Sequence, residues 1–171
     1  AKTWSTASGK NPDGDVRTEL ITAANLSGIR PNRALYGDTA WDTRGASHEA
    51  QTTAGGFAAS SRTPEQVAAA LNLDGVHVSK ERYATDPGAT SLSEVVSTKV
   101  IMFAAQAGMD REDPSNIKRF VGNCSGEAGG GRIGVYLRPV GDKCFRLAVE
   151  HHELIAITST LGIRQFTVAA S

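Results

Sequence analysis

The chain has 171 residues, enough for one compact domain of ordinary size with room for a second small lobe. Lysine plus arginine equals aspartate plus glutamate, at 18 each, so no net field draws the chain to nucleic acid or to an anionic membrane surface. Hydrophobic residues make up 40% of the chain, yet no apolar run approaches the roughly 18 residues that a membrane span needs. We therefore expect neither a membrane nor a sequence-specific nucleic-acid partner.

The sequence also lacks signals for export. Its first residues, AKTWSTASGKNPDGD, show no basic region followed by an apolar one, so no signal peptide is expected. Its two cysteines, Cys124 and Cys144, are too few for a disulfide framework and fit a reducing compartment. We expect synthesis in a cytoplasm.

The first predicted helix starts where Asp13 or Asp15 can cap it and ends at Gly28. Pro31 cannot continue a helix and forces extended geometry on Arg30. RALY, residues 33–36, is then predicted to form a short strand. The stripe expected to be buried along the helix consists of Val16, Leu20, Ile21, Ala24 and Leu26.

Further helices are predicted in the next part of the chain. Asp38 is expected to cap a helix that runs through Trp41. Residues 47–61 are rich in alanine but contain Gly55 and Gly56, which predicts a weak helix with a break at the glycines.

The clearest helix signal lies in TPEQVAAALNLDG, residues 63–75. Thr63 is the predicted N-cap, Pro64 occupies the first helical position, Gln66 completes a capping box, and Gly75 lies beyond the end. The stretch 76–83, VHVSKERY, alternates apolar and polar residues as a short strand does.

Strand signals dominate the second half of the chain. Residues 97–106, STKVIMFAAQ, form a continuous apolar run typical of a strand buried on both faces. Five more strands are predicted, within residues 117–122, 132–140, 144–150, 153–160 and 164–170. Helices early and strands late indicate the α+β class, not a wound parallel sheet.

Two motifs match patterns of ligand binding but lack the context that such binding needs. GGGRIG, Gly129 to Gly134, matches G-x-G-x-x-G, but a strand-like VYLRPV follows it where pyrophosphate binding needs a helix, so a hairpin or surface loop is favoured. EHHE, Glu150 to Glu153, contains two adjacent histidines. On a strand they would point to opposite faces, so they could not coordinate one metal ion together. No metal or cofactor is expected.

A third motif supports an alternative function. GNCSG, Gly122 to Gly126, has the form of a nucleophile elbow with Cys124 in the reactive position. A cysteine hydrolase would use Cys124 as nucleophile, His151 as base and Asp142 to orient that base. A small structural cysteine is the favoured interpretation.

One ordered set of segments resembles a known family. SGIRPN (27–32), RALYGD (33–38), TAW (39–41) and TPEQVAAALNLDGVHVSKERY (63–83) resemble, in order and spacing, the major capsid protein of tailed bacteriophages, whose fold encapsulin nanocompartments share. Ser27 stands where the family usually has threonine, and Ser79 replaces a glycine. The resemblance covers roughly residues 13–85.

The resemblance implies a phage capsid (Johnson) fold with two lobes. A peripheral lobe would hold the spine helix, and an axial lobe would hold a mixed sheet with flanking helices. The implied division is 1–36 for the N-terminal segment, spine helix and start of the peripheral lobe, 37–150 for the axial lobe, and 151–171 for strands that return to the periphery. Since few residues precede the helix, the family's N-terminal arm and extended loop are not expected here.

The resemblance also implies a function, a structural subunit that assembles with copies of itself into pentamers, hexamers and an icosahedral shell around a genome. Such a protein is not an enzyme, resides in the virion, and has scaffold or decoration proteins as possible partners. Gly28, Pro31 and Asn32 would form the turn after the spine helix. Candidate subunit-contact loops contain Met109, Asp110, Arg111, Glu112, Asp113, Glu127, Gly129 and Gly130.

Overall fold

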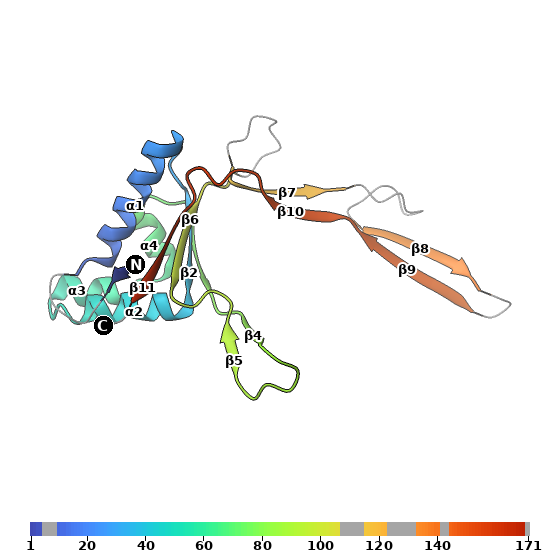
Figure 1. The fold of residues 1–171 in the computed structure, drawn as a ribbon, viewed down its shortest axis with the longest axis horizontal. Coiled ribbons are helices and arrows are strands. Elements are labelled where there is room, and N and C mark those ends of the chain that lie inside the picture. Colours follow the sequence, from blue (N-terminus) through green and yellow to red (C-terminus); the bar gives the residue numbers. More distant parts are fainter. Residues whose placement is uncertain (5–9, 107–114, 123–132, 141–143, 170–171) are drawn as a thin grey trace. The chain divides into compact units, whose positions relative to one another are not determined.

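The computed structural model describes residues 1–4, 10–106, 115–122, 133–140 and 144–169 (Figure 1). The chain divides into two compact units. Unit 1 comprises residues Ala1–Asn116 and Ser159–Ser171, and unit 2 comprises Ile117–Thr158.

Unit 1 contains four helices and seven strands within its described residues. The helices are α1 (Pro12–Ser27), α2 (Asp38–Glu49), α3 (Ala54–Ser60) and α4 (Pro64–Leu71). The strands are β1 (Lys2–Thr3), β2 (Arg33–Gly37), β3 (Gly75–Ser79), β4 (Arg82–Ala84), β5 (Leu92–Glu94), β6 (Lys99–Phe103) and β11 (Arg164–Ala169). The α+β class predicted from the sequence is confirmed.

A five-stranded mixed sheet forms the frame of unit 1, in the order β1-β11-β6-β2-β3. The middle strand, β6, pairs antiparallel with both β2 and β11, whereas β2 pairs parallel with β3 and β1 pairs parallel with β11. The parallel β2–β3 pair is connected through α2, α3 and α4, as a crossover requires. The short strands β4 and β5 pair with each other in a separate hairpin.

The helices α1 and α4 lie on one face of this sheet and enclose its core (Figure 1). Alternate residues of the central strands point into the core, such as Tyr36 on β2 and Val100 and Met102 on β6, all of which are fully buried. The opposite face of β6 carries Ile101 and Phe103, which are half-buried. The run 97–106 therefore supplies the middle strand, as its apolar character predicted, but only one of its faces is fully buried.

Helix α1 ends where predicted and begins differently. Gly28 closes it in the left-handed conformation, with φ of 73°, and its N–H donates to the carbonyl of Ala24 over 2.8 Å. The N-cap is Asn11, whose side chain accepts from the N–H of Gly14 over 2.9 Å, and not Asp13 or Asp15. Asp13 is unavailable for capping because its carboxylate turns inward to a buried arginine.

The buried stripe of α1 is narrower than predicted. Val16, Leu20 and Ala23 are fully buried, whereas Ile21 and Leu26 are more than half exposed, at 51% and 57%. The sheet covers one face of the helix, and Ile21, one position beyond the buried Leu20, lies off that face.

The helix break lies at residues 50–53, between α2 and α3, and not at Gly55 and Gly56. Those glycines are inside α3, whose N-cap Thr53 accepts from the N–H of Gly56 over 3.0 Å. A Cβ on Gly56 would stand 2.5 Å from the carbonyl oxygen of His48, so the glycine allows close approach to the end of α2. Gly37, not Asp38, is the N-cap of α2.

The capping box of α4 is confirmed. Thr63 accepts from the N–H of Gln66, whose side chain accepts in return from the N–H of Thr63 over 3.0 Å. Asn72 ends the helix in the left-handed conformation, with φ of 56°. Residues 76–83 contain parts of two strands, β3 and β4, where the sequence predicted one.

Unit 2 consists of two antiparallel ribbons. The first pairs β7 (Ile117–Val121) with β10 (Glu153–Ile157), and the second pairs β8 (Ile133–Pro139) with β9 (Phe145–His151). All four strands were predicted. Among its described residues, Gly134 alone is buried, so these ribbons enclose no core of their own.

The division into three segments of a capsid subunit stays a prediction. The contacts within the chain divide it in a different way, into two units. Strand β2 comes mostly from the predicted segment 1–36, β3 and β6 from 37–150, and β11 from 151–171, yet all four join one sheet. Residues 117–158, divided between two of the predicted segments, form unit 2.

Candidate functional site: a turn, a buried polar cluster and an uncovered apolar face

The residues predicted to form the turn after the first helix lie between α1 and β2, where Asn32 joins distant segments. Pro31 is fully buried. The side-chain amide of Asn32 donates to the carboxylate of Asp74 over 2.6 Å and to the carbonyl of Ala105 over 2.9 Å, and its oxygen accepts from the N–H of Ala105 over 2.8 Å. Pro31 and Asn32 therefore belong to the packing of unit 1, whereas Gly28 is exposed and ends α1 through its backbone conformation.

The backbone of Asn32 does not adopt the left-handed conformation that asparagine tolerates in turns. Outside glycine, the described residues with positive φ are Thr52 and Asn72. Asn32 acts through its side chain instead, because its amide can donate to the carbonyl of Ala105 and accept from the N–H of the same residue at once.

The predicted contact loops lie outside the described residues. This applies to Met109, Asp110, Arg111, Glu112, Asp113, Glu127, Gly129 and Gly130, and also to Cys124 and Asp142 of the alternative hydrolase. Of that triad the structure describes only His151, the last residue of β9, whose Nε2 lies 3.2 Å from a carboxylate oxygen of Glu153.

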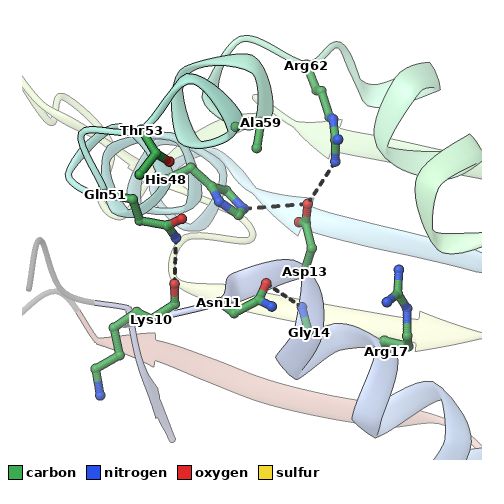
Figure 2. Close-up of a pocket in the computed structure, with 11 residues that line it drawn as sticks. Lys10, Asn11, Asp13, Gly14, Arg17, His48, Gln51, Thr53, Ala59 and Arg62 are labelled. Carbon is green, nitrogen blue, oxygen red and sulfur yellow. Dashed lines mark hydrogen bonds and ion pairs between the residues drawn. The ribbon is translucent and has the colours of Figure 1, made fainter. Parts of the chain in front are cut away.

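A buried polar cluster, which the sequence did not predict, surrounds Asp13 at the start of α1. The guanidinium of Arg44 on α2 donates twice to the Asp13 carboxylate, over 2.7 and 2.8 Å. His48 Nε2 and Arg62 each lie 3.5 Å from the same carboxylate (Figure 2). Arg44 is 1% exposed, so the pair is removed from water and the two charges depend on each other.

The cluster sets the protonation of its members. Burial by itself would raise the pKa of Asp13, but the hydrogen bonds and charge of Arg44, with the charges of His48 and Arg62, outweigh it and leave the pKa below its ordinary value. Burial lowers the pKa of His48, and the attraction of Asp13 does not offset burial together with the charge of Arg44. Burial also raises the pKa of Tyr36, whose hydroxyl has no hydrogen-bond partner among the described residues.

A pocket of about 620 Å³ opens beside this cluster (Figure 2). Lys10, Arg17 and Arg62 bring positive charge to its lining. Two of its polar side chains already join elements of unit 1, because Arg17 donates to the carbonyl of Ala70 and Gln51 donates to the carbonyl of Lys10. We interpret the pocket as part of the packing of unit 1 around α1.

The sequence held one signal for this cluster. Arg44 and His48 stand four residues apart on a helix, which places both on one face. Asp13 was interpreted as a helix cap, which is usually exposed to solvent. The residues near Asp13 in the sequence do not indicate that α2 packs over it.

The described part of unit 2 has an uncovered apolar face. In the β8–β9 register, Val135 stands opposite Val149 and Leu137 opposite Leu147, and opposite residues of an antiparallel pair share a face. The face that they share, the apolar ribbon face, also includes Ile133, Pro139 and Phe145. Phe145 is 68% exposed and Leu147 64%, so the described residues leave this face open to solvent.

The other face of the same ribbon is polar. Tyr136 donates through its hydroxyl to the carboxylate of Glu150 over 3.0 Å, and Arg138 pairs in register with Arg146. This alternation was visible in the sequence, where VYLR and FRLAVE change between apolar and polar residues at nearly every step. What the sequence could not show is that nothing in the described part of unit 2 would cover the apolar side.

The second ribbon also exposes apolar side chains. Phe120, Leu154, Ile155 and Ile157 are each at least half exposed, and an ion pair between Arg119 and Glu153 connects β7 to β10. Within the described residues no helix is long and apolar enough to cross a membrane. An exposed apolar area of this extent makes unit 2 a candidate interaction surface.

Comparison with solved structures gives a likeness of fold, but comparison with family models and curated proteins gives none. No known family model matches the sequence, and a search of curated proteins finds no match. A solved structure described as a phage-related protein from Bordetella bronchiseptica RB50 aligns with a TM-score of 0.64 at 19% sequence identity. The alignment covers 97% of this chain and 51% of that one, so the chain spans about half the length of its structural neighbour and shares the fold of that half.

Proposed function

We propose that this chain is a structural subunit of an icosahedral bacteriophage capsid, a major head protein that resides in the virion. The observation that carries the proposal is the exposed apolar surface of unit 2, on ribbons whose described residues enclose no core of their own. A chain that presents such a surface gains free energy when another protein covers it, at roughly 25 cal/mol for each Å² of apolar area removed from water.

Two further findings support a phage structural role. The structural neighbour is described as phage-related, and the alignment with it extends over nearly the whole of this chain, 97%. Independently, the ordered segments 27–41 and 63–83 resemble the major capsid protein of tailed phages, and the structure has a helix end, a sheet strand and a capped helix in that order there. The Johnson fold itself remains part of the proposal.

The mechanism of a shell subunit is geometric. Copies of one chain meet through repeated contacts that close into pentamers and hexamers. Each contact can be weak because an assembly makes many of them at high effective concentration. The proposed role is not catalytic and needs no cofactor, and scaffold or decoration proteins are the further partners we propose.

Electron microscopy tests this proposal. The complete reading frame that encodes this chain is expressed, and its product is examined by sedimentation and by negative staining over a range of salt concentrations. We expect closed particles, or discrete pentamers and hexamers. A product that stays monomeric at high concentration, with no particle under any ionic condition, would overturn the capsid proposal.

A further inference from the structure

The apolar ribbon face is continuous and free of charge over most of its length. Six of its apolar side chains are 40% to 68% exposed, namely Ile133, Val135, Leu137, Phe145, Leu147 and Val149. They alternate with the residues of the other face, and the register places them in opposed pairs. Since a one-residue slip would exchange the two faces, the alternation fixes which side of the ribbon is apolar.

A ribbon of this kind requires a cover. A two-stranded hairpin alone is at best marginally stable in water, and sheets become stable when an apolar face packs on another layer. Face-to-face packing of two sheets, about 10 Å apart, buries the inner side chains of both. The described residues of unit 2 supply no such layer.

The chemistry of the face fits an identical face better than a polar partner. Apart from His151 at one end, its side chains carry no ionisable group, so two copies meet without like charges opposed. Six side chains of this exposure leave on the order of 600 Å² open, and two faces together would bury about 1,200 Å², the lower limit for a specific interface. The arginines Arg138 and Arg146 stay on the outer, solvent side.

We infer that the apolar ribbon face packs against the same face of a second copy of this chain. The contact is isologous, because the same surface serves on both copies. The inference rests on the proposed self-assembly and identifies one surface that joins copies in pairs, beside the heterologous contacts that close rings. The inference also explains why apolar and polar residues alternate along a ribbon that has no core of its own. On association, the ribbon of the second copy becomes the layer that covers the apolar face.

Matched double variants of the full chain test the inference. Leu137→Thr with Leu147→Thr removes an opposed pair at the centre of the face and keeps good strand formers. Arg138→Thr with Arg146→Thr changes the adjacent opposed pair, on the polar face, and is the control. Sedimentation equilibrium gives the dissociation constant of the copies, and fluorescence of Trp4 and Trp41, both in unit 1, checks that unit 1 is folded.

We expect the leucine variant to raise the dissociation constant by roughly a hundredfold or more, since four leucines leave the contact, and the arginine variant to change it by less than about threefold. Equal dissociation constants for the wild type and the leucine variant would overturn the inference. If the product of the complete reading frame still forms particles in that case, the capsid proposal holds, and the copies assemble through surfaces other than the apolar ribbon face.

A charge-complementation experiment guards against a variant whose ribbon fails to fold. Leu147→Glu and Leu147→Lys are made separately, and each alone is expected to weaken association, because it buries a charge in an apolar contact. Mixing the two is expected to restore association at least about tenfold over either alone, which needs two folded ribbons facing each other. No gain on mixing, together with an unchanged dissociation constant for the Leu137→Thr and Leu147→Thr double variant, overturns the inference.

The two proposals fail in different ways. A wild-type chain that sediments as a monomer at every concentration overturns the inference. The apolar ribbon face would then be covered by something other than a second copy of the chain. Copies that associate through the ribbon, from a reading frame that never yields particles, pentamers or hexamers, uphold the inference and overturn the capsid proposal.

Discussion

At the scale of single residues, Asp13 shows how a position can suit a local role and perform a distant one. Its place at the start of a helix suggests a cap, yet it forms two hydrogen bonds with Arg44, 31 residues further along the chain. Asn11 takes the cap instead. A buried ion pair stabilises only while both partners remain, because removing one leaves an uncompensated charge.

The same cluster predicts how stability depends on pH. The pKa of His48 is lowered in the folded chain, mainly by burial, from an ordinary value of 6.5. As the pH falls below that value, the unfolded chain takes up a proton that folded His48 resists, so the free energy of unfolding decreases. Asp13, whose pKa is lowered from 3.8, adds a second decrease at lower pH.

We therefore expect urea unfolding, followed by tryptophan fluorescence, to show stability that holds above about pH 7 and falls as the pH drops through about 6 and 5. His48→Gln should remove this first decrease and leave the one below about pH 4. His77→Gln, at an exposed position on β3, is the control for loss of a histidine. An unchanged profile in His48→Gln would contradict the assignment.

At the scale of elements, two glycines end their elements for different reasons. Gly28 ends α1 with φ of 73°, and a Cβ there would meet nothing within 4 Å. Gly37 ends β2 with an ordinary φ of −72°, but a Cβ there would overlap the carbonyl oxygens of Val96 and Ser97. Gly28 is therefore favoured by its left-handed backbone conformation, whereas Gly37 is required because no space is left for a Cβ.

The two alanine variants should therefore differ in cost. Gly28→Ala should lower the free energy of unfolding by about 1 kcal/mol, the strain of a left-handed alanine. Gly37→Ala should cost more than about 3 kcal/mol or prevent folding, since its Cβ meets backbone that cannot turn aside. Urea unfolding monitored by Trp4 and Trp41 measures both, and equal costs would show that the approach of residues 96–97 to β2 is wrong.

At the scale of the whole molecule, the chain combines one unit with a core and one whose described residues form none. In unit 1, helices close one face of a five-stranded sheet around side chains such as Leu20, Tyr36 and Met102, all fully buried. In unit 2, the described strands pair only in twos. Local stability follows buried apolar contact, so the two units should open independently.

Hydrogen exchange followed by mass spectrometry can compare the units. In dilute chain, amides of β7 to β10 should exchange at least about tenfold faster than those of β2 and β6, which lie inside the five-stranded sheet. Raising the protein concentration should slow exchange in β8 and β9 selectively. Equal protection of both units in dilute chain would show that unit 2 has a stabilising layer of its own.

The sequence by itself determined the elements whose signals are local. The capping box at Thr63, the stop at Gly28 and the alternating strands of unit 2 were predicted because neighbours within a few residues provide the contacts. The α+β class followed from their order. Boundaries such as Asn11 and the break at 50–53 were missed where several residues could serve as a cap.

Only the tertiary structure decided which segments meet. It joined β2, β6 and β11 in one sheet although they are far apart in the chain, buried Asp13 against Arg44, and left Ile21 outside. These outcomes depend on pairing between distant segments, which alternation and capping do not encode. The same physics explains the ribbon of unit 2, whose sequence specifies an apolar face, while only the fold shows that the described residues leave this face uncovered.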